Sequence, residues 1–320
     1  MILLANEVII FLFVEGLLLL LQSIAFINAI SILSRWNFTS FSALQYRLEK
    51  RAYLVVLIIL FTLGFKIVML PFFSYTIDQL SVIVPGAMCG AGVISANEYG
   101  PVLLFLKVMI LFLIGSWLIL NNEDIKASSY PYFKAKLWLF LLIYLLVVTE
   151  SVLDILYLTN IPIDDPVSCC STIYGIAGGG DPLPFSLDTA RLLMLFYLIY
   201  ALILATNYFR YTYINLVANL FFLYIAYHAV VYFFGTYVYE LPTHQCPFCM
   251  LQKEYFYVGY FIWGSLFLGA FFGIAGAILK GIMRKEVDFV YGASALFNTI
   301  FVLLCSLYVA VYYLKTGVFL

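Results

Sequence analysis

Charged side chains are scarce in this chain of 320 residues, of which Asp, Glu, Lys and Arg make up 10% and hydrophobic residues 65%. A soluble globular domain has about a quarter charged residues and cannot cover so much apolar surface. The formal net charge of −1 also lacks the basic excess typical of nucleic-acid-binding proteins. The composition therefore predicts an integral membrane protein that lies in lipid and has no nucleic-acid partner.

Histidine is also rare, since the chain has only His228 and His244. A bis-histidine haem needs paired histidines on neighbouring helices, so we expect no haem. A zinc ribbon needs a second C-x-x-C pair or suitably spaced histidines, and the sequence therefore assigns no metal ligands of that type. The apolar segment from Ile2 has no basic region before it and no A-x-A cleavage site before Arg35, so we interpret it as a retained helix.

Long apolar runs dominate the rest of the chain, and a bilayer crossing needs roughly 20 mostly apolar residues. This length predicts eight spans, near residues 4–33, 53–76, 101–120, 137–158, 188–207, 214–236, 254–279 and 289–314. We therefore expect an all-α polytopic helix bundle that forms a single transmembrane domain over residues 1–320. In the seventh span, Gly269 and Gly273 form a G-x-x-x-G step, which lets another helix approach closely.

The basic residues predict the orientation of these spans. Eleven of them lie on one set of loops, namely Arg35, Arg47, Lys50, Arg51, Lys126, Lys134, Lys136, Arg210, Lys280, Arg284 and Lys285. The opposite set holds Arg191, Lys253 and Lys315 and is otherwise acidic. Loops rich in Lys and Arg remain in the cytoplasm. We therefore expect both termini to be extracytoplasmic, on the periplasmic side of the inner membrane if the source is a bacterium.

Five cysteines fall in three of the outer loops, where disulfides can form and persist. They are Cys89, Cys169, Cys170, Cys246 and Cys249, and we take them as the candidate catalytic residues. Cys246 and Cys249 form a C-x-x-C pair just before the seventh span. A helix N-terminus there, with His244 and Lys253 nearby, would stabilise the reactive thiolate. The sixth cysteine, Cys305, lies within the eighth span, as a core or lipid-facing residue.

The segment Cys246-Pro247-Phe248-Cys249, with Lys253 after it, resembles the membrane thiol oxidoreductases of the DsbB and vitamin K epoxide reductase type. The resemblance covers about eight of the 320 residues. Those families are built on a four-helix core, and the DsbB pattern has arginine where this chain has Lys253. The resemblance implies that Cys246 and Cys249 exchange electrons with a quinone and that Lys253 lies near the quinone head group.

The other outer cysteines allow two interpretations. Adjacent cysteines seldom bond to each other, so we expect Cys169 and Cys170 to have different partners. One could bridge to Cys89 while the other exchanges with Cys246 or Cys249, which would make a relay; alternatively, the bridge only staples loops. Cys89 itself lies in a run of small residues, 85–92, which is either a re-entrant segment packed against the Cys246 loop or a flexible loop.

Ionisable residues inside membrane spans are costly and are therefore functional candidates. In this chain they are Glu15, Lys66, Lys107, Glu150 and Asp154. Glu150 and Asp154 are four residues apart and share one helix face. We assign Glu150 and Lys107, together with His244 and Lys253, to a candidate quinone site, because quinone reduction consumes two protons that carboxylates could relay. The alternative is a set of structural ion pairs.

Three functions are consistent with these patterns. The first is an integral-membrane thiol–disulfide oxidoreductase, coupled to a quinone, that exchanges electrons with an extracytoplasmic thiol protein. The second is a transport or delivery protein for a soft metal, Cu or Hg, that uses the outer thiols for capture. The third is a membrane anchor or accessory subunit of a larger respiratory complex, in which the cysteines hold loops in shape.

Overall fold

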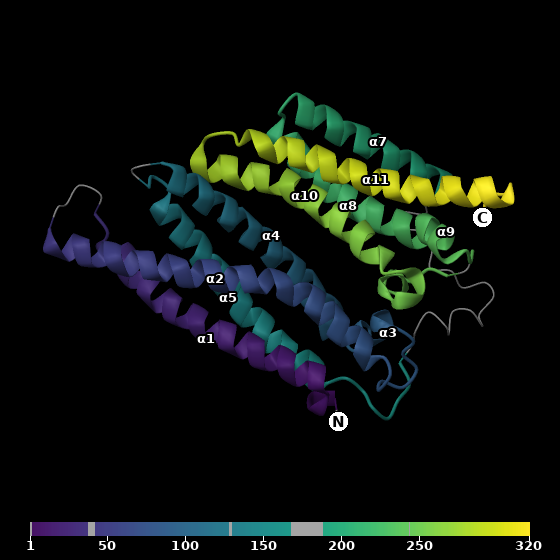
Figure 1. The fold of residues 1–320 in the computed structure, drawn as a ribbon, viewed down its shortest axis with the longest axis horizontal. Helices are drawn as coiled ribbons and strands as arrows, with labels where there is room; N and C mark the ends of the chain where they lie inside the picture. Colours follow the sequence, from purple (N-terminus) through teal and green to yellow (C-terminus); the bar gives the residue numbers. More distant parts are fainter. Residues whose placement is uncertain (1, 38–41, 128–129, 168–187, 243) are drawn as a thin grey trace. The chain divides into compact units, whose positions relative to one another are not determined.

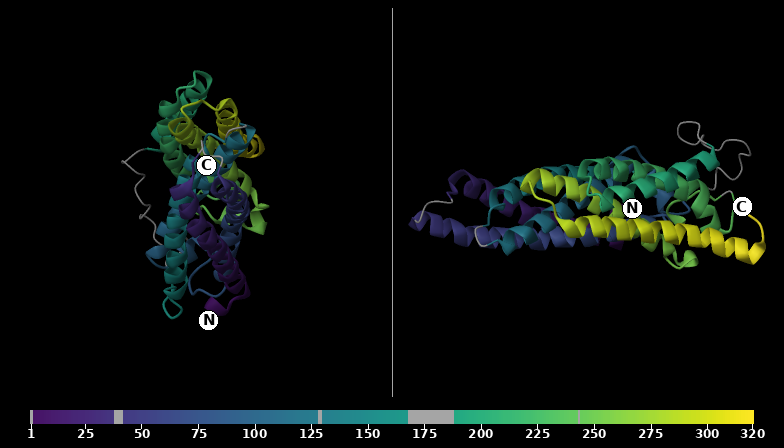
Figure 2. Two further views of the ribbon diagram at one scale, coloured as in Figure 1. Left: turned by 90° about the vertical axis from the view of Figure 1, so that its left-hand side faces the viewer. Right: turned by 90° about the horizontal axis from the view of Figure 1, so that it is seen from above.

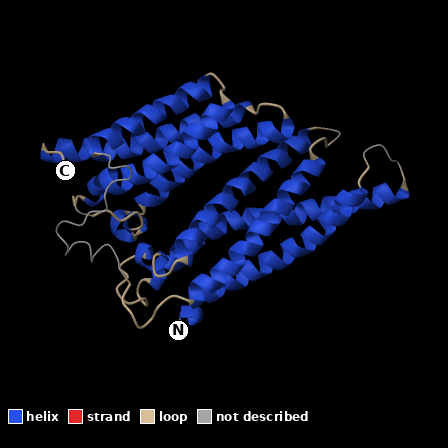
Figure 3. Cartoon of the chain, turned by 180° about the vertical axis from the view of Figure 1, so that it is seen from behind, coloured by secondary structure: helices blue, strands red, loops and turns tan. Residues whose placement is uncertain are grey.

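The protein is all-helical wherever the structure, a computed structural model, describes it. The described residues are 2–37, 42–127, 130–167, 188–242 and 244–320, and they contain helices, turns and loops but no strand (Figure 3). Eight helical segments within these ranges have the length and composition of membrane spans (Figure 1). Both the all-α fold and the multi-pass membrane character that the sequence predicts are therefore confirmed.

The chain divides into two compact units. The N-terminal unit comprises Met1–Pro85 and Val93–Val167, and the C-terminal unit comprises Gly86–Gly92 and Ser168–Leu320. A short segment around Cys89 thus belongs to the C-terminal unit, although it lies between two spans of the N-terminal unit in the sequence. Each unit contains four of the eight spans.

The N-terminal unit is built from α1 (Asn6–Arg35), α2 (Ala43–Leu80), α4 (Tyr99–Lys126) and α5 (Phe133–Thr159). Helix α1 packs against α2 and α5, and α4 packs against α5 and α2 (Figure 1, Figure 2). The bounds agree with the predicted spans except at two ends: α2 begins at Ala43, well before the predicted start at 53, and α4 continues to Lys126, past the predicted end at 120. Arg47, Lys50 and Arg51 extend α2, because Lys and Arg are good helix formers even beyond the apolar layer.

The C-terminal unit is built from α7 (Thr189–Tyr208), a composite sixth span, α10 (Val258–Met283) and α11 (Asp288–Thr316). The composite span runs through α8 (Thr212–Ala229), a π-helical turn (Val230–Phe234) and α9 (Gly235–Tyr239). Helix α10 packs against α8 and α11, and α7 packs against the same two helices.

An aromatic core holds the C-terminal unit together. The ring of Phe196 on α7 lies 5.4 Å from that of Phe222, 5.1 Å from that of Phe234 and 5.9 Å from that of Phe301. All four side chains are almost completely buried. Rings at these separations gain from favourable tilted and edge-on contacts in addition to their packing.

Buried amides form a second layer beside this core. Asn298 donates to the Asn219 side-chain oxygen at 3.1 Å, Asn219 donates to that of Asn215 at 2.9 Å, and Asn215 donates to that of Asn207 at 3.0 Å. The chain of amides crosses from α11 through α8 to α7. Each amide supplies a partner that the hydrocarbon layer cannot offer, so the contacts fix how the three helices pack.

The two glycines of the G-x-x-x-G step lie against this amide chain. A Cβ atom on Gly273 would lie 2.2 Å from the Asn219 side-chain nitrogen, and one on Gly269 would lie 2.8 Å from the backbone nitrogen of Asn298. Both distances are far below van der Waals contact. The predicted close approach at Gly269 and Gly273 is confirmed, and the neighbours are α11 and α8.

We expect Gly269→Ala to destabilise the protein, because the added methyl group clashes with the backbone of α11 as well as with the Asn298 side chain. Overpacking of this kind costs roughly 1–3 kcal/mol, which thermal unfolding in detergent would detect. The matched control is Gly264→Ala on the same helix, where the new Cβ meets nothing within 4 Å. Equal melting temperatures for the two variants would contradict the tight crossing.

Candidate functional site

Three cysteine sulfurs gather inside the C-terminal unit. The Sγ atoms of Cys89, Cys246 and Cys249 all lie within 4.8 Å of one another, and those of Cys89 and Cys246 are 3.3 Å apart. Cys89 and Cys246 are buried, and Cys249 is 9% exposed. We call this group the sulfur triad. Its members come from two segments that are 157 residues apart in the sequence.

The segment Gly86–Gly92 brings Cys89 to the other two sulfurs. Gly86 has a φ of +79°, a conformation that residues with a Cβ rarely adopt, so the turn into the segment favours glycine. The short helix α3 (Gly90–Ile94) begins directly after Cys89. Cys89 and Ala91 pack into the hydrophobic core of the C-terminal unit. Of the two expectations for this run of small residues, the structure confirms packing against the Cys246 loop.

Two aromatic side chains hold the C-x-x-C loop in place. The Tyr239 hydroxyl donates to the Cys246 carbonyl oxygen and accepts from the Met250 backbone N–H at 3.1 Å. The Trp263 indole N–H donates to the Pro247 carbonyl oxygen at 3.0 Å. These contacts satisfy buried backbone groups in a segment that has no regular helix to satisfy them. They also tie the loop to the two spans on either side of it.

The start of the seventh span differs from the prediction. Helix α10 begins at Val258, and two 3₁₀ turns, Cys249–Leu251 and Lys253–Tyr255, separate it from the C-x-x-C pair. Phe256 and Tyr257 then adopt left-handed backbone conformations, which interrupt the helix. The expectation that a long helix begins directly after Cys249 and stabilises its thiolate is therefore wrong.

Other groups stabilise a thiolate at the triad. Hydrogen bonds from the Cys246 and Cys249 thiols, and from the backbone N–H groups of Ala91 and Gly92, lower the pKa of Cys89 against the opposing effect of burial. A thiolate on Cys89 thus accepts hydrogen bonds from the other two thiols of the triad. Burial lowers the pKa of His244, while the negative charge on Cys89 opposes that shift.

Of the five predicted catalytic cysteines, the structure brings together Cys89, Cys246 and Cys249. Cys169 and Cys170 lie outside the described residues. Cys305 is buried in the core of the C-terminal unit, which confirms its expected place inside the eighth span.

The four residues assigned to a quinone site fall into two pairs. The His244 ring packs tilted against that of Tyr239, with ring centroids 4.0 Å apart, beside the triad, and Lys253 is exposed on the second 3₁₀ turn. Lys107 and Glu150 instead belong to the N-terminal unit, where they form a buried ion pair at 2.7 Å. The thiols and the intramembrane charges are therefore held by different units.

Sequence reasoning did not single out Tyr239 or Trp263. Tyr239 is one of 26 tyrosines, and no spacing sets it apart from the others. Trp263 offers a weak signal, because a tryptophan within an apolar helix usually finds a partner for its N–H.

The sulfur triad can support two kinds of chemistry. Any two of the sulfurs can form a disulfide while the third remains close enough to attack it. Alternatively, three thiolates this close together can ligate one soft metal ion. No protein-family model, no curated protein and no solved structure matches this chain.

We expect the reduced protein to keep a thiolate at a pH well below the ordinary thiol pKa of about 8.5. Because the folded-state pKa of Cys89 is lowered, the thiolate is present above that lowered value and disappears only when the pH falls through it. Ultraviolet thiolate absorbance against pH measures this transition. Cys246→Ala removes the main hydrogen-bond donor and should move the transition to higher pH, whereas Cys305→Ala should not. Identical titration curves for both variants would contradict the assignment.

Proposed function

We propose that this protein is an integral-membrane thiol–disulfide oxidoreductase whose redox site is the sulfur triad. The observation that carries the proposal is the 3.3 Å separation of the Cys89 and Cys246 sulfurs, with Cys249 within 4.8 Å of both. A disulfide between Cys89 and Cys246 would leave the third sulfur in position to attack. A structural disulfide requires only two cysteines, so the third favours exchange.

The proposed exchange keeps atoms and electrons in balance. A disulfide that joins Cys89 to Cys246 is attacked by the Cys249 thiolate at the Cys246 sulfur. The Cys246–Cys249 disulfide forms, and the Cys89 thiolate leaves with the electron pair of the broken bond. An extracytoplasmic dithiol protein would supply two electrons by the same reaction, through a mixed disulfide, and would become oxidised as the triad disulfide is reduced.

A lipid-soluble quinone would accept those two electrons, with two protons, and become a quinol. In this proposal, aromatic rings beside the triad would stack on the flat quinone head group. The ring centroids of Tyr255 and Tyr239 are 4.8 Å apart. Those of Tyr227 and Trp263, the side chain that holds the C-x-x-C loop, are 5.9 Å apart. Tyr227 is 44% exposed, so the rings continue from the sulfur loop to the surface of the unit, from which a quinone would arrive.

The size of the C-terminal unit also supports the proposal. The resemblance to the DsbB and vitamin K epoxide reductase type concerns proteins with a four-helix core. The C-terminal unit has four spans, and the C-x-x-C pair lies in the connection between the second and third of them. By that resemblance, Cys246 and Cys249 would be the pair that exchanges electrons with the quinone, and the exposed Lys253 would lie near its head group.

We further propose that the triad faces the outside of the membrane and that both termini are extracytoplasmic. The supporting observation is the order of the spans along the sequence: if the eight spans cross the membrane in turn, all eleven basic residues fall on one side and the C-x-x-C loop falls on the other. Reporter domains fused after Leu320 and within the α10–α11 loop, around residue 286, should report opposite sides. The same side for both fusions would contradict this orientation.

The redox proposal predicts that Cys249→Ala traps an intermediate. In that variant a Cys89–Cys246 disulfide, formed by exchange with the oxidised partner, meets no Cys249 thiolate that could resolve it, so it should accumulate. Mass spectrometry of digested protein would identify the linked peptides. Turnover of a soluble quinone with a small dithiol should fall to background in this variant and remain in Cys305→Ala.

The same samples separate redox chemistry from soft-metal binding, the second candidate that the three converging sulfurs favour. If the reduced wild type retains one equivalent of Cu(I), each triad variant loses it, and no quinone turns over, the protein is a metal-binding one. Quinone turnover that survives the loss of each triad cysteine in turn would overturn the redox proposal. The matched Cys305→Ala protein controls for the general effect of losing a buried thiol.

A further inference from the structure

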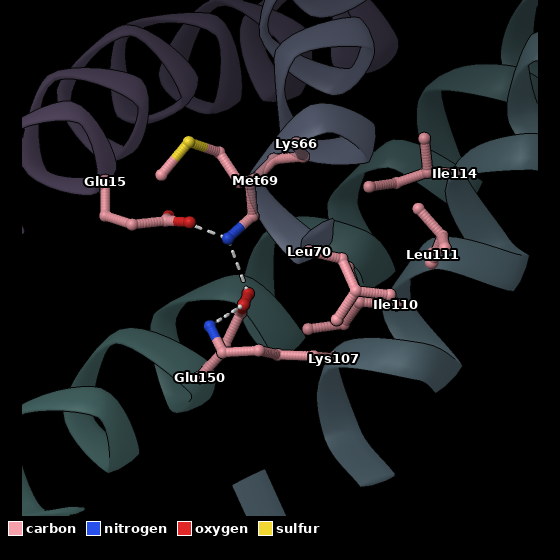
Figure 4. A pocket seen from close by; sticks show the side chains of 9 residues that line it. All are labelled: Glu15, Lys66, Met69, Leu70, Lys107, Ile110, Leu111, Ile114 and Glu150. Atoms are coloured by element: carbon pink, nitrogen blue, oxygen red, sulfur yellow. Dashed lines mark hydrogen bonds and ion pairs between the residues drawn. The ribbon is translucent and has the colours of Figure 1, made fainter. Parts of the chain in front are cut away.

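Five buried charged residues of the N-terminal unit form one continuous chain of ion pairs. The Lys66 Nζ atom lies 2.7 Å from a carboxylate oxygen of Glu15 and 2.7 Å from one of Glu150. The Lys107 Nζ atom lies 2.7 Å from the other oxygen of Glu150 and 3.0 Å from an oxygen of Asp154. The order is therefore Glu15, Lys66, Glu150, Lys107, Asp154, with the sign of the charge alternating at each step. Figure 4 shows the first four of these side chains converging from four helices. We call this group the charge chain.

The charge chain does not balance. Three carboxylates face two ammonium groups, so the fully ionised chain has a net charge of −1, and every side chain in it is at most 6% exposed. An uncompensated charge in the hydrocarbon layer costs several kcal/mol or more. The nearest further titratable group on these helices, Tyr157, donates its hydroxyl hydrogen to the Val93 carbonyl oxygen at 2.9 Å. It leaves the charge balance unchanged.

The two ends of the chain have unused oxygen atoms. Glu150 contacts both lysines, whereas Glu15 and Asp154 each contact one. Glu15 Oε1 and Asp154 Oδ1 are buried and have no hydrogen-bond partner among the residues that the structure describes. A buried carboxylate oxygen without a partner is strongly disfavoured, but a protonated carboxyl group is neutral and tolerates the site.

A small cavity lies beside the Glu15 end of the chain. Its lining includes Glu15, Lys66, Lys107 and Glu150, with Met69 and Ile110 on the apolar side (Figure 4). The centre of a water molecule can occupy a volume of about 10 Å³ in this cavity. That volume is close to the minimum that holds one water. Water at that point would provide a route by which a proton reaches or leaves the Glu15 carboxyl group.

We propose that the charge chain is a proton-binding site, which holds one exchangeable proton on its terminal carboxyl groups, Glu15 and Asp154. One bound proton brings the net charge from −1 to zero. A metal cation such as Na⁺ fits less well, because two ammonium groups face the same carboxylates and the cavity is too small for an ion with its ligand shell. The proposal does not depend on the thiol chemistry of the other unit.

The position of the site within the helices suits exchange with one side of the membrane. At about 1.5 Å per residue, Asp154 lies roughly 8 Å from the end of α5, and Glu15 roughly 14 Å from the start of α1. Both of these helix ends lie at the same end of the unit. The N-terminal unit would thus load or release a proton from that side, which is the basic requirement of a proton-coupled membrane protein.

Infrared spectroscopy of the full-length protein in lipid tests the proposal. The wild type at neutral pH should show the C=O stretching band of one protonated carboxylic acid, and the band should shift in D₂O. Glu15→Gln or Asp154→Asn each leaves two carboxylates facing two ammonium groups, so each substitution alone should abolish the band. Glu123→Gln, which affects a surface ion pair with Lys126 on the same unit, should leave it unchanged.

The proposal can be tested even if a variant fails to fold, because it requires the wild type itself to show the protonated carboxyl band. A wild type without a protonated carboxyl group at neutral pH would overturn the proposal. So would a band that persists in both Glu15→Gln and Asp154→Asn. A band that appears in choline buffer and disappears when Na⁺ is added would show a metal-cation site instead, and would equally overturn it.

Discussion

The hydrocarbon layer offers no hydrogen-bond partner and screens no charge, and the internal arrangement of both units follows from this constraint. A polar side chain that enters a span has to find its partner on its own helix, as Ser116 does, or on a neighbouring span. The N-terminal unit meets the requirement with ion pairs, in which Glu150 links Lys66 to Lys107 across three helices. The C-terminal unit meets it with neutral amides, in which Asn219 joins Asn298 to Asn215. The two solutions differ in consequence, because a chain of amides carries no charge, whereas a chain of charged groups is neutral only when its charges sum to zero.

The sulfur triad lies outside that constraint, in connections where the backbone is irregular and needs local partners. Tyr239 and Trp263 supply them for the C-x-x-C loop. Cys89 arrives on a separate segment whose sequence neighbours belong to the N-terminal unit. Neither segment forms the triad alone, and each is short enough to be held by a few contacts. Thiols that undergo exchange need such a placement, since sulfur atoms must move by an ångström or more as bonds form and break, while a packed helix interior resists displacement.

The parts of this structure that could be predicted from the sequence are those that lipid dictates. Apolar runs of sufficient length predict the eight spans, and the scarcity of charge within them singles out Glu15, Lys66, Lys107, Glu150 and Asp154 as residues that must be paired. The glycine step predicts a tight crossing for the same reason, since only small residues let helix backbones approach. By contrast, the contact between Cys89 and Cys246 joins residues 157 positions apart through loops that follow no period. The start of α10 was missed because the left-handed residues Phe256 and Tyr257 are aromatic, and nothing in their chemistry predicts that conformation.

Both candidate sites share a property that separates them from structural elements, namely an odd number of groups that pair two by two. Two cysteines close a disulfide and two opposite charges close an ion pair, and an element of that kind can be inert. The triad has three sulfurs, so one of them always remains outside any disulfide and is available as a thiol or thiolate. The charge chain has five members that begin and end with a carboxylate, so one negative charge is always left over. In a buried position neither remainder is stable on its own, because an unpaired thiolate or carboxylate loses its hydration without compensation. The two proposals rest on this odd member, which would be an attacking sulfur in the triad and a proton-binding carboxylate in the charge chain.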